Sequence, residues 1–308
     1  MKNVYFTVFT PVYNRKDKIH RVWESLNKQT FCDFEWIIVD DGSTDGVEQI
    51  LREYKEKATF SITILRQQNS GKHIAWNRAV KIARGELFVP ADSDDAFVED
   101  TLEFFYKKWQ IYSKDEKEDL SGINVLCKDS LTENVVGDYF PFSGFLSNNL
   151  DLAYKYKVRG EKWGCIKVTA LKQRVFPEVK SSHMSESWIW FWLARKYNVV
   201  CYNKVLRIYY QNEGNALSDK PSYSTLKARS RVDYIHGVWN LNENIDYLLK
   251  YEDKLQLFKK FLVFWRTAFL NKKNVCRVFS DLNNNISKIL AFISVLPGYI
   301  LFVKTKLE

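Results

Sequence analysis

Residues 83–95 read ARGELFVPADSDD, and this stretch decides how the first third of the chain is interpreted. An apolar run, Leu87–Val89, leads directly into the acidic cluster Asp92-Ser93-Asp94-Asp95. Three carboxylates within four residues repel one another unless a cation lies between them, and hard divalent cations prefer such oxygen ligands. The stretch therefore predicts a strand that ends in a cation site. For this pattern taken alone, a solvated acidic turn is the alternative interpretation.

Strand and helix patterns alternate on the N-terminal side of this stretch. Strands are predicted at Val4–Thr10, Phe34–Val39 and Phe60–Ile64, where β-branched and aromatic residues are concentrated. Helices are predicted after each strand from apolar residues at i, i+3, i+4 and i+7, and the last of them covers Gly71–Arg84. Asp45 and Glu48 are spaced as a capping box for the second of these helices. This alternation predicts a mostly parallel sheet with helices on both faces.

Polar clusters follow three of the predicted strands, at residues 10–14, 40–43 and 92–95. Ligands of parallel sheets bind at the carboxyl ends of the strands, so these clusters are expected at one edge of the sheet. Asp40 would add a separate acceptor for the N–H of a base or for a ribose hydroxyl. A nucleotide-diphosphate pocket is therefore predicted at this edge.

The pattern weakens beyond residue 100. A helix at Leu102–Tyr112, a strand at Ser121–Lys128, a helix at Glu186–Tyr197 and one or two strands at Val199–Tyr210 are predicted, with an irregular stretch over residues 134–160. From about residue 220 the pattern is helical to the end. We expect a domain over residues 1–218, with a nucleotide-binding half at 1–100 and an acceptor half at 101–218, followed by a basic helical tail at 219–308.

Charge and cysteine content narrow the class of protein. The net charge of the 308 residues is +9, and the excess lies in the tail, where 15 Lys and Arg face 8 Asp and Glu. The five cysteines are scattered without a CxxC pair, which argues against a disulfide framework and against a zinc site. A reducing cytosol is the expected compartment.

Four motifs in order resemble glycosyltransferase family 2 of the GT-A fold. They are TPVYNR at 10–15, IIVDDGSTD at 37–45, NSGKHIAWNRAV at 69–80 and ARGELFVPADSDD at 83–95. The resemblance is strong over residues 1–100 and weaker over residues 160–218. It implies a Rossmann-like, mixed and mostly parallel α/β sheet with flanking helices, followed here by a helical segment that associates with membranes.

The resemblance also implies roles for particular residues in binding the donor nucleotide. Thr10, Pro11 and Tyr13 are expected to line the nucleotide pocket, and Asp40 is expected to accept the uracil N–H. Asp92 and Asp94 would be the DxD pair that holds Mn2+ or Mg2+, with Ser93 between them in the donor site and Asp94 as the direct metal ligand. Lys72 follows Gly71 at a helix N-terminus, where its ammonium could meet phosphate. An exposed surface lysine is the alternative for Lys72.

Glu186 is the expected catalytic base. It opens SESWIWFWLARKY, and the base of the resembled family sits in an acidic pair just before a similar aromatic helix. This chain has Ser187 in place of the second acid, so either Glu186 acts alone or the base lies elsewhere. A helix N-terminal Glu stabilised by the macrodipole is the plain structural alternative. His73, His183, the RGEK segment at 159–162 and a closing loop at 210–218 are weaker candidates for the site.

Two apolar and aromatic runs mark the tail. They are Leu255–Leu270 and Ile289–Val303, bordered by Lys259, Lys260, Arg266, Lys272, Lys273, Lys304 and Lys306. The second run has 15 residues and contains Pro297-Gly298, which is short of the roughly 20 residues of a spanning helix. A monotopic helix on an anionic membrane surface is therefore expected. Packing on the catalytic domain or a homodimer contact is the alternative, and nucleic acid is not an expected partner.

Together these features predict an inverting, metal-dependent, non-processive glycosyltransferase. It would move a hexose, galactose or glucose, from a UDP-sugar to a polyprenyl-diphosphate-linked saccharide in bacterial O-antigen or capsule synthesis. It would act at the cytoplasmic face of the inner membrane. The alternative is a catalytically silent GT-A module that binds a nucleotide or a lipid.

Overall fold

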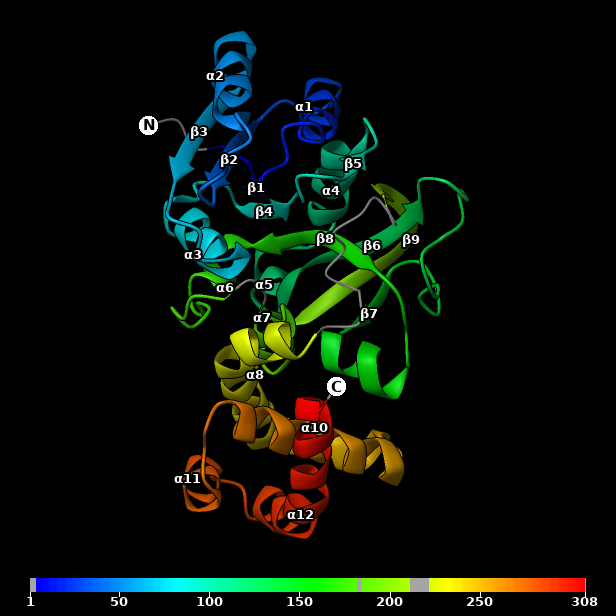
Figure 1. The fold of residues 1–308 in the computed structure, drawn as a ribbon. Coiled ribbons are helices and arrows are strands. Elements are labelled where there is room, and N and C mark those ends of the chain that lie inside the picture. Colours follow the sequence, from blue (N-terminus) through cyan, green and yellow to red (C-terminus); the bar gives the residue numbers. More distant parts are fainter. Residues whose placement is uncertain (1–3, 182–183, 211–221, 308) are drawn as a thin grey trace. The chain divides into compact units, whose positions relative to one another are not determined.

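A computed structural model describes residues 4–181, 184–210 and 222–307. The chain divides into two compact units, which are described separately (Figure 1). The first unit comprises Met1–Phe176 with Trp192–Ala216, and the second comprises Pro177–Phe191 with Leu217–Glu308. Residues 177–191, which the sequence placed in the first domain, thus group with the C-terminal helices.

The first unit is built on a sheet with the strand order β3-β2-β1-β4-β8-β6-β9-β5, and β7 pairs with β9. Its N-terminal part is parallel and consists of β1 (Phe6–Val12), β2 (Phe34–Asp40), β3 (Ser61–Arg66) and β4 (Leu87–Pro90). The register pairs Val12 with Asp40 and Phe9 with Pro90, so the carboxyl ends of these strands meet at one edge.

The remaining strands make the sheet mixed. They are β5 (Ala96–Phe97), β6 (Leu120–Asp129), β7 (Phe145–Ser147), β8 (Lys162–Lys167) and β9 (Asn198–Tyr209). β6 and β9 run parallel, whereas β8 is antiparallel to both β4 and β6, and β5 and β7 are antiparallel to β9. The expected mixed sheet with flanking helices is confirmed, and each antiparallel pairing involves a strand that follows β4.

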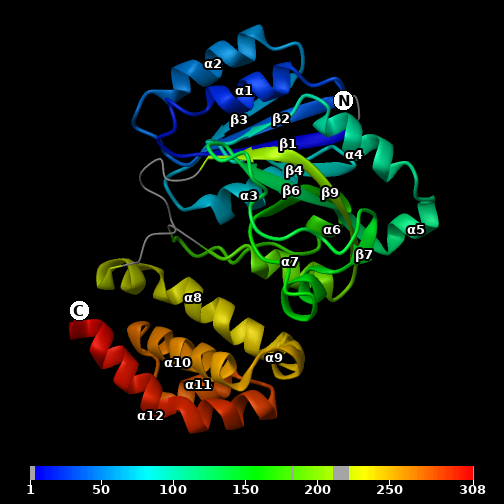
Figure 2. The same cartoon turned by 90° about the vertical axis from the view of Figure 1, so that its right-hand side faces the viewer.

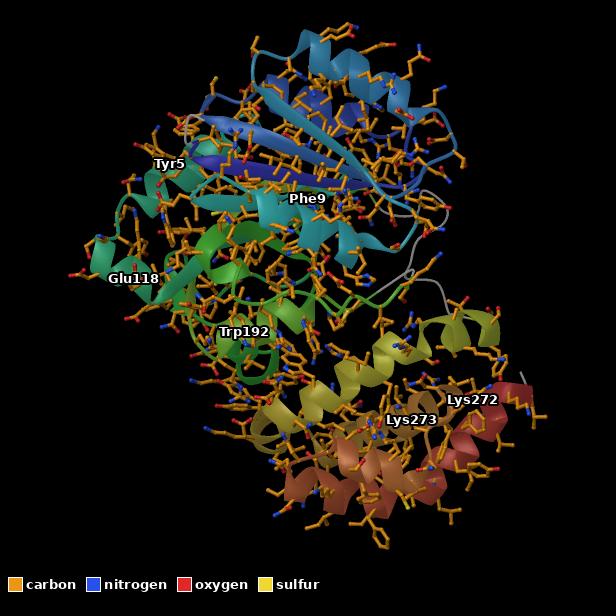
Figure 3. The ribbon with its side chains drawn as sticks, turned by 90° about the vertical axis from the view of Figure 1, so that its left-hand side faces the viewer. Tyr5, Phe9, Glu118, Trp192, Lys272 and Lys273 are labelled. Carbon is orange, nitrogen blue, oxygen red and sulfur yellow. The ribbon has the colours of Figure 1, made fainter. Side chains whose placement is uncertain are left out.

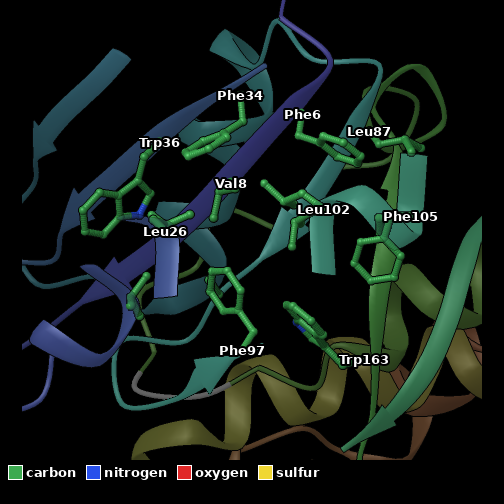
Figure 4. Packing of buried hydrophobic residues seen from close by; sticks show 14 of the residues in the cluster. Phe6, Val8, Leu26, Phe34, Trp36, Leu87, Phe97, Leu102, Phe105 and Trp163 are labelled. Atoms are coloured by element: carbon green, nitrogen blue, oxygen red, sulfur yellow. The ribbon is translucent and has the colours of Figure 1, made fainter. Parts of the chain in front are cut away.

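Helices cover both faces of the parallel strands, because the strands present apolar side chains on both faces. The helices of this unit are α1 (His20–Asn27), α2 (Val47–Lys57), α3 (Lys72–Ile82), α4 (Thr101–Trp109), α5 (Lys114–Glu118) and α6 (Val168–Leu171). Figure 2 shows α1 and α2 on one side of β1–β3 and α3 on the other. Phe6, Val8 and Trp36 belong to the core cluster shared with α1, α2 and α4 (Figure 4). On the opposite face, Phe9 and Phe88 pack against Trp76 of α3.

The start of α2 differs from the predicted capping box. Gly46 is the N-cap, with a positive φ of 84° that glycine adopts without strain, and it has no side chain with which to cap the helix. Asp45 instead accepts a hydrogen bond from the Val47 backbone, and Glu48 pairs with Arg66. A capping box is found at α5, where Ser113 and Glu116 cap each other's backbone N–H groups.

The segment predicted to be irregular contains short elements. Residues 134–160 include β7 and a short π-helix at Asp151–Lys155, and β8 follows at once. These elements are too short, or too rich in tryptophan and glycine, to produce a periodic pattern. β8 was not predicted, although it joins the parallel half of the sheet to β6.

The second unit is helical. It contains the start of α7 (Ser187–Ala194), followed by α8 (Tyr223–Glu243), α9 (Ile245–Tyr251), α10 (Lys254–Leu270), α11 (Val275–Asp281) and α12 (Asn285–Leu307). Contrary to the expected interruption, α12 continues through Pro297. Gly298 allows α12 to approach α10 closely, since a Cβ there would lie 2.3 Å from the Trp265 Cβ, and the Trp265 indole donates to the Ala291 carbonyl at 2.9 Å. Trp265 of α10 thus contacts α12 on both sides of the proline.

α12 is the one helix, among the described residues, long and apolar enough to cross a membrane. Its 23 residues exceed the 15-residue run seen in the sequence because the flanking polar residues are helical as well. Large apolar side chains line its exposed face, among them Phe292, Ile293, Leu296 and Ile300, and Phe292 is 70% exposed.

Candidate active site

The loops after β1 and β2 are tied together at the carboxyl edge of the sheet. The Asn14 backbone donates to the Ser43 hydroxyl at 2.9 Å, and the Thr44 backbone donates to the Asn14 side-chain oxygen at 2.8 Å. Asn14 has a positive φ of 50°, which asparagine tolerates better than most residues. The two loops therefore form one surface rather than two independent turns.

Asp40, the last residue of β2, presents a buried acceptor at this edge. The residue is 2% exposed, and its Oδ1 accepts a hydrogen bond from the Ser43 backbone at 2.8 Å. Its Oδ2 lies 3.4 Å from Arg66 Nη1 and has no hydrogen-bond partner within the described part of the chain. A buried carboxylate oxygen without a donor is costly, and the N–H of a bound base would satisfy it.

The three residues expected to line the nucleotide pocket differ in how accessible they are to a ligand. The Thr10 hydroxyl is buried and accepts a hydrogen bond from the Trp36 indole at 2.9 Å, so it is occupied inside the fold. Pro11 is partly buried and is paired in register with Val39. Tyr13 follows the strand and is 47% exposed, so its ring is available to a ligand.

Asp41 fixes the turn before α3 and was not singled out from the sequence. Its Oδ1 accepts hydrogen bonds from Gln67 Nε2 at 2.8 Å and from the Ser70 backbone at 2.7 Å. Its Oδ2 accepts one from the Gly71 backbone at 2.8 Å. Asp41 therefore holds the residue that precedes Lys72, and with it the N-terminus of α3.

Lys72 and Asp92 meet directly at the edge. Lys72 Nζ lies 2.6 Å from Asp92 Oδ1, and about a third of each side chain is exposed. Burial acts to raise the pKa of the Asp92 carboxyl, but Lys72 and Arg207 together outweigh it and lower that pKa to about 2. Asp92 is therefore ionised at neutral pH, and Lys72 is positioned over the acidic cluster.

Arg207 of β9 is the buried counter-ion of the acidic cluster. Its guanidinium pairs with Asp95 through Nε at 2.8 Å and through Nη2, and Nη2 lies 3.0 Å from Asp92 Oδ2. Burial raises the pKa of Asp95 above its usual range, whereas Arg207 opposes this rise. Arg207 is 5% exposed and lies more than a hundred residues from the cluster in sequence. In the sequence, the only indication of a residue such as Arg207 was that a buried acidic cluster needs a cation.

Asp94 is the carboxylate of the cluster that is most available to a metal ion. Its side chain is 35% exposed, and its Oδ2 lies 3.4 Å from Arg15 Nε. Its backbone carbonyl accepts a hydrogen bond from Arg21 at 2.7 Å, which fixes the loop, and Ser93 beside it is buried. Within the described ranges no cluster of three or more His, Cys, Asp or Glu residues could hold a metal. Two carboxylates do fit Mg2+ or Mn2+ whose other ligands are phosphate oxygens and water.

The comparison with protein families decides the class of this domain. Residues 7–118 match the family described as "Glycosyl transferase family 2". The chain contains a family 2 glycosyltransferase domain. The matched range includes the ends of β1, β2 and β4 and the whole acidic cluster, and the resemblance read from the four motifs is confirmed.

Curated bacterial glycosyltransferases are among the proteins similar to this chain. A poly(ribitol-phosphate) beta-glucosyltransferase of Bacillus spizizenii is 40% identical over 126 residues, which is 38% of this chain and 19% of that protein. The chain thus spans about a fifth of this relative.

Two solved structures share the fold. Residues 1–349 of S. aureus TarS, in complex with UDP-GlcNAc, match with a TM-score of 0.58 and 21% identity, covering 96% of this chain and 89% of that one. The mannosyltransferase PcManGT of Pyrobaculum calidifontis, in complex with GDP-Man and Mn2+, matches with a TM-score of 0.54 and 16% identity, covering 99% and 85%. These similarities establish the GT-A-like fold.

The RGEK segment meets the same cluster through Glu161. Glu161 Oε1 lies 3.3 Å from Arg207 Nη1, and Lys162 Nζ donates to the Arg159 carbonyl at 2.8 Å. The Arg159 backbone in turn donates to Asp138 at 2.8 Å. The segment is therefore held in place and brings a further carboxylate to Arg207.

Glu186 belongs to the second unit and directly precedes α7. Its side chain is partly exposed, and its carbonyl accepts hydrogen bonds from the backbones of Ile189 and Trp190. Ser187, which replaces the second acid, shares a hydrogen bond of 2.8 Å with His236 Nε2 of α8. Sequence analysis did not single out His236, because a lone histidine in a helix gives no signal.

Two weaker candidates lie outside the described residues, namely His183 and residues 211–218 of the expected closing loop. The ring of His73 is buried and lies 6.1 Å from that of Phe176 in an edge-on arrangement. This histidine therefore belongs to the packing beneath α3.

Proposed function

We propose that this protein is a metal-dependent, inverting glycosyltransferase that uses a UDP-sugar. The observation that supports this proposal most directly is a buried oxygen of Asp40 that has no hydrogen-bond donor. It lies at the same sheet edge as the Lys72–Asp92–Arg207 cluster. One end of this edge offers an acceptor to a base, and the other offers charges to a diphosphate. The UDP-GlcNAc in the TarS structure supports a UDP-sugar as the donor.

The residues of the edge divide the work of donor binding. Asp40 takes the N–H of the uracil, and the exposed ring of Tyr13 lies at the mouth of the loop surface. Lys72 contacts the diphosphate, since its ammonium stands at the N-terminus of α3, where the helix dipole also favours anions. Asp94, with Asp92, holds Mn2+ or Mg2+, which neutralises charge on the departing diphosphate when bound. The Mn2+ of PcManGT supports this assignment.

Glu186 acts as the general base. Inversion requires a carboxylate that removes the proton of the acceptor hydroxyl as it attacks from the face opposite the leaving group. Glu186 stands before an aromatic helix whose first turn is held by the Ser187–His236 hydrogen bond. A single acid held in this way is sufficient, because only one proton is removed in each transfer.

The proposed acceptor is a phosphate-bearing saccharide or polyol. A polyprenyl-diphosphate-linked saccharide of O-antigen or capsule synthesis was expected from the sequence, and the glucosyltransferase relative is named for poly(ribitol-phosphate). Both carry phosphate esters next to hydroxyl groups. The transferred sugar is a hexose, galactose or glucose. The apolar face of α12 would hold the enzyme at the cytoplasmic face of the membrane.

The test is UDP release from a panel of UDP-glucose, UDP-galactose and UDP-GlcNAc with Mn2+ or Mg2+. Polyprenyl-diphosphate saccharide and poly(ribitol phosphate) are supplied as separate acceptors. We expect acceptor-dependent release that EDTA abolishes and that falls by about a hundredfold or more in Glu186→Gln, because general-base catalysis contributes about 10²–10⁴. Asp94→Ala should lose the metal-dependent release.

Matched controls use exposed acids away from the edge, Asp115→Ala for the metal ligand and Glu56→Gln for the base. Both should turn over like the unaltered protein. Release that survives Glu186→Gln would assign the base to another residue. Metal-dependent UDP binding without release from any donor would instead establish the silent binding module.

A further inference from the structure

The helical unit contains a cavity of about 600 Å³ lined by none of the residues assigned above to donor binding or catalysis. One side of it is a single face of α8, and the other sides come from the turn that follows α10 and from α11. The lining residues are Arg231, Tyr234, Ile235, Val238, Trp239, Asn271, Lys272, Lys273, Arg277 and Asp281. All of them lie in the second unit, so the cavity is formed within one compact body.

The charges around this cavity are unbalanced. Four cationic side chains face one carboxylate, Asp281, which already pairs with Arg277 at 3.0 Å and accepts a hydrogen bond from the Tyr234 hydroxyl at 2.9 Å. Arg231, Lys272 and Lys273 have no carboxylate within ion-pair distance in the part of the chain that the structure describes. Three uncompensated cations at one concave site favour an anionic ligand.

The two lysines occupy a sharply defined turn. The Lys272 backbone donates to the Phe269 carbonyl and the Lys273 backbone donates to the Ala268 carbonyl, both at 2.9 Å. This is the hydrogen-bond pattern of a Schellman motif, in which the first residue after the helix cap is usually glycine. Lys272 fills that position with a φ of 55°, so a charged side chain stands where glycine would be less strained. Figure 3 labels both lysines.

Aromatic rings complete the cavity. Lys273 Nζ lies 5.3 Å from the centroid of the Tyr234 ring, and Trp239 packs against Trp188 at 4.9 Å between centroids. Rings beside cations suit a ligand that combines phosphate with a sugar or polyol chain, because the chain can lie on the ring while the phosphate meets the ammonium and guanidinium groups.

We propose that this cavity binds a phosphate group of the acceptor, a phosphodiester chain of sugar or polyol units. The identification of the ligand as the acceptor rests on the proposed function. Phosphate binding in the cavity does not depend on transfer. The cavity would hold the acceptor chain by its anionic backbone and leave the choice of reacting hydroxyl to the active site.

The test measures binding rather than turnover, with the full chain. A short poly(glycerol phosphate) chain and inorganic pyrophosphate are titrated separately and followed by calorimetry and by tryptophan fluorescence. In the double variant Lys272→Gln with Lys273→Gln we expect the Kd for poly(glycerol phosphate) to rise about tenfold or more, since each substitution removes a charged hydrogen bond to phosphate. Lys227→Gln, an exposed lysine of α8 outside the cavity, should bind like the unaltered protein.

A second variant separates binding from folding. Lys272→Gly removes one charge and relieves the left-handed backbone, so its melting temperature should stay equal or rise while its affinity for the chain falls. UDP binding to the family 2 domain should be unchanged in every variant, which would show that the variants are folded. Absence of UDP binding or of turnover in the unaltered protein would count against the proposed function and not against the cavity.

Three outcomes would overturn the proposal. The first is that the double variant binds poly(glycerol phosphate) as tightly as Lys227→Gln does. The second is that neither poly(glycerol phosphate) nor pyrophosphate binds to the unaltered protein. The third is retention on anionic phospholipid vesicles, lost in the double variant, without binding of the soluble chain, which would assign the cavity to lipid headgroups.

Discussion

Arg207 shows at the scale of one residue how the acidic cluster can exist in the interior. It is the buried partner of Asp95 and also contacts Asp92 and Glu161. In Arg207→Met the Asp95 carboxylate would remain buried without a cation, so we expect the free energy of unfolding to fall by about 3–5 kcal/mol. Urea denaturation followed by circular dichroism measures this change.

A second substitution tests the cause of that loss. Adding Asp95→Asn to Arg207→Met removes the orphaned charge, so the double variant should recover part of the stability. A loss below about 1 kcal/mol in Arg207→Met would show that the cluster is solvated, as the alternative reading of the DSDD stretch had it.

The sequence predicted the acids of this site better than their partners. Asp92, Asp94 and Asp40 could be placed at one edge because they directly follow predicted strands, and the register confirms that these ends meet. Arg207 could not be found, since its place depends on the pairing of β5 and β6 with β9 across distant sequence. Asp41 was missed because a sequence does not tell which of two adjacent carboxylates turns toward the loop before α3.

At the scale of elements, α7 depends on a contact from α8. Ser187 and His236 share a hydrogen bond, and Trp239 packs on Trp188 one turn further along. In His236→Ala the first turn of α7 would loosen and Glu186 would be placed less accurately. We expect kcat to fall about tenfold, with an unchanged KM for the UDP-sugar, because small displacements of a catalytic group reduce rate more than binding. Steady-state kinetics with the best donor measures this split.

The conservative variant provides the control for α7. His236→Asn keeps a hydrogen-bonding side chain and should restore part of kcat, whereas thermal melting should change little in either variant. A rise in KM without a change in kcat would contradict the positioning role and would assign His236 to donor binding.

The parallel half of the sheet was predictable because its strands and helices are long and strictly periodic. β1 to β4 and the helices between them follow the predicted ranges within a few residues. β7 and β8 were not predictable from local pattern, since β7 has three residues and β8 contains Trp163 and Gly164 in a segment of low periodicity. Their formation depends on edges offered by β4, β6 and β9.

At the scale of the whole molecule, α12 carries the proposed attachment to the membrane. We expect the full chain to sediment with anionic phospholipid vesicles. The double variant Ile293→Asp with Ile300→Asp should reduce the bound fraction about tenfold or more, because each isoleucine contributes about 1.5–3 kcal/mol when it leaves water. Ile111→Asp is the matched control, since Ile111 is also exposed but lies in the first unit.

An alkaline carbonate wash separates the two kinds of membrane contact. A helix that lies on the surface as a peripheral attachment should be released by the wash, whereas a spanning helix should stay in the pellet. Equal sedimentation of the α12 variant and the Ile111 control would contradict attachment through this face and favour a contact between protein surfaces.

The hydrogen bonds that Asp41 accepts have a consequence for how the preference for a donor sugar can change. Its hydrogen bonds to Gln67, Ser70 and Gly71 order the loop before α3 during folding, so a ligand need not order this segment when it binds. The apparent affinity for the donor is then not reduced by molecules in which this loop is unformed. Substitutions that alter the choice of sugar should therefore lie outside the loop at 67–71, which stays a fixed part of the fold.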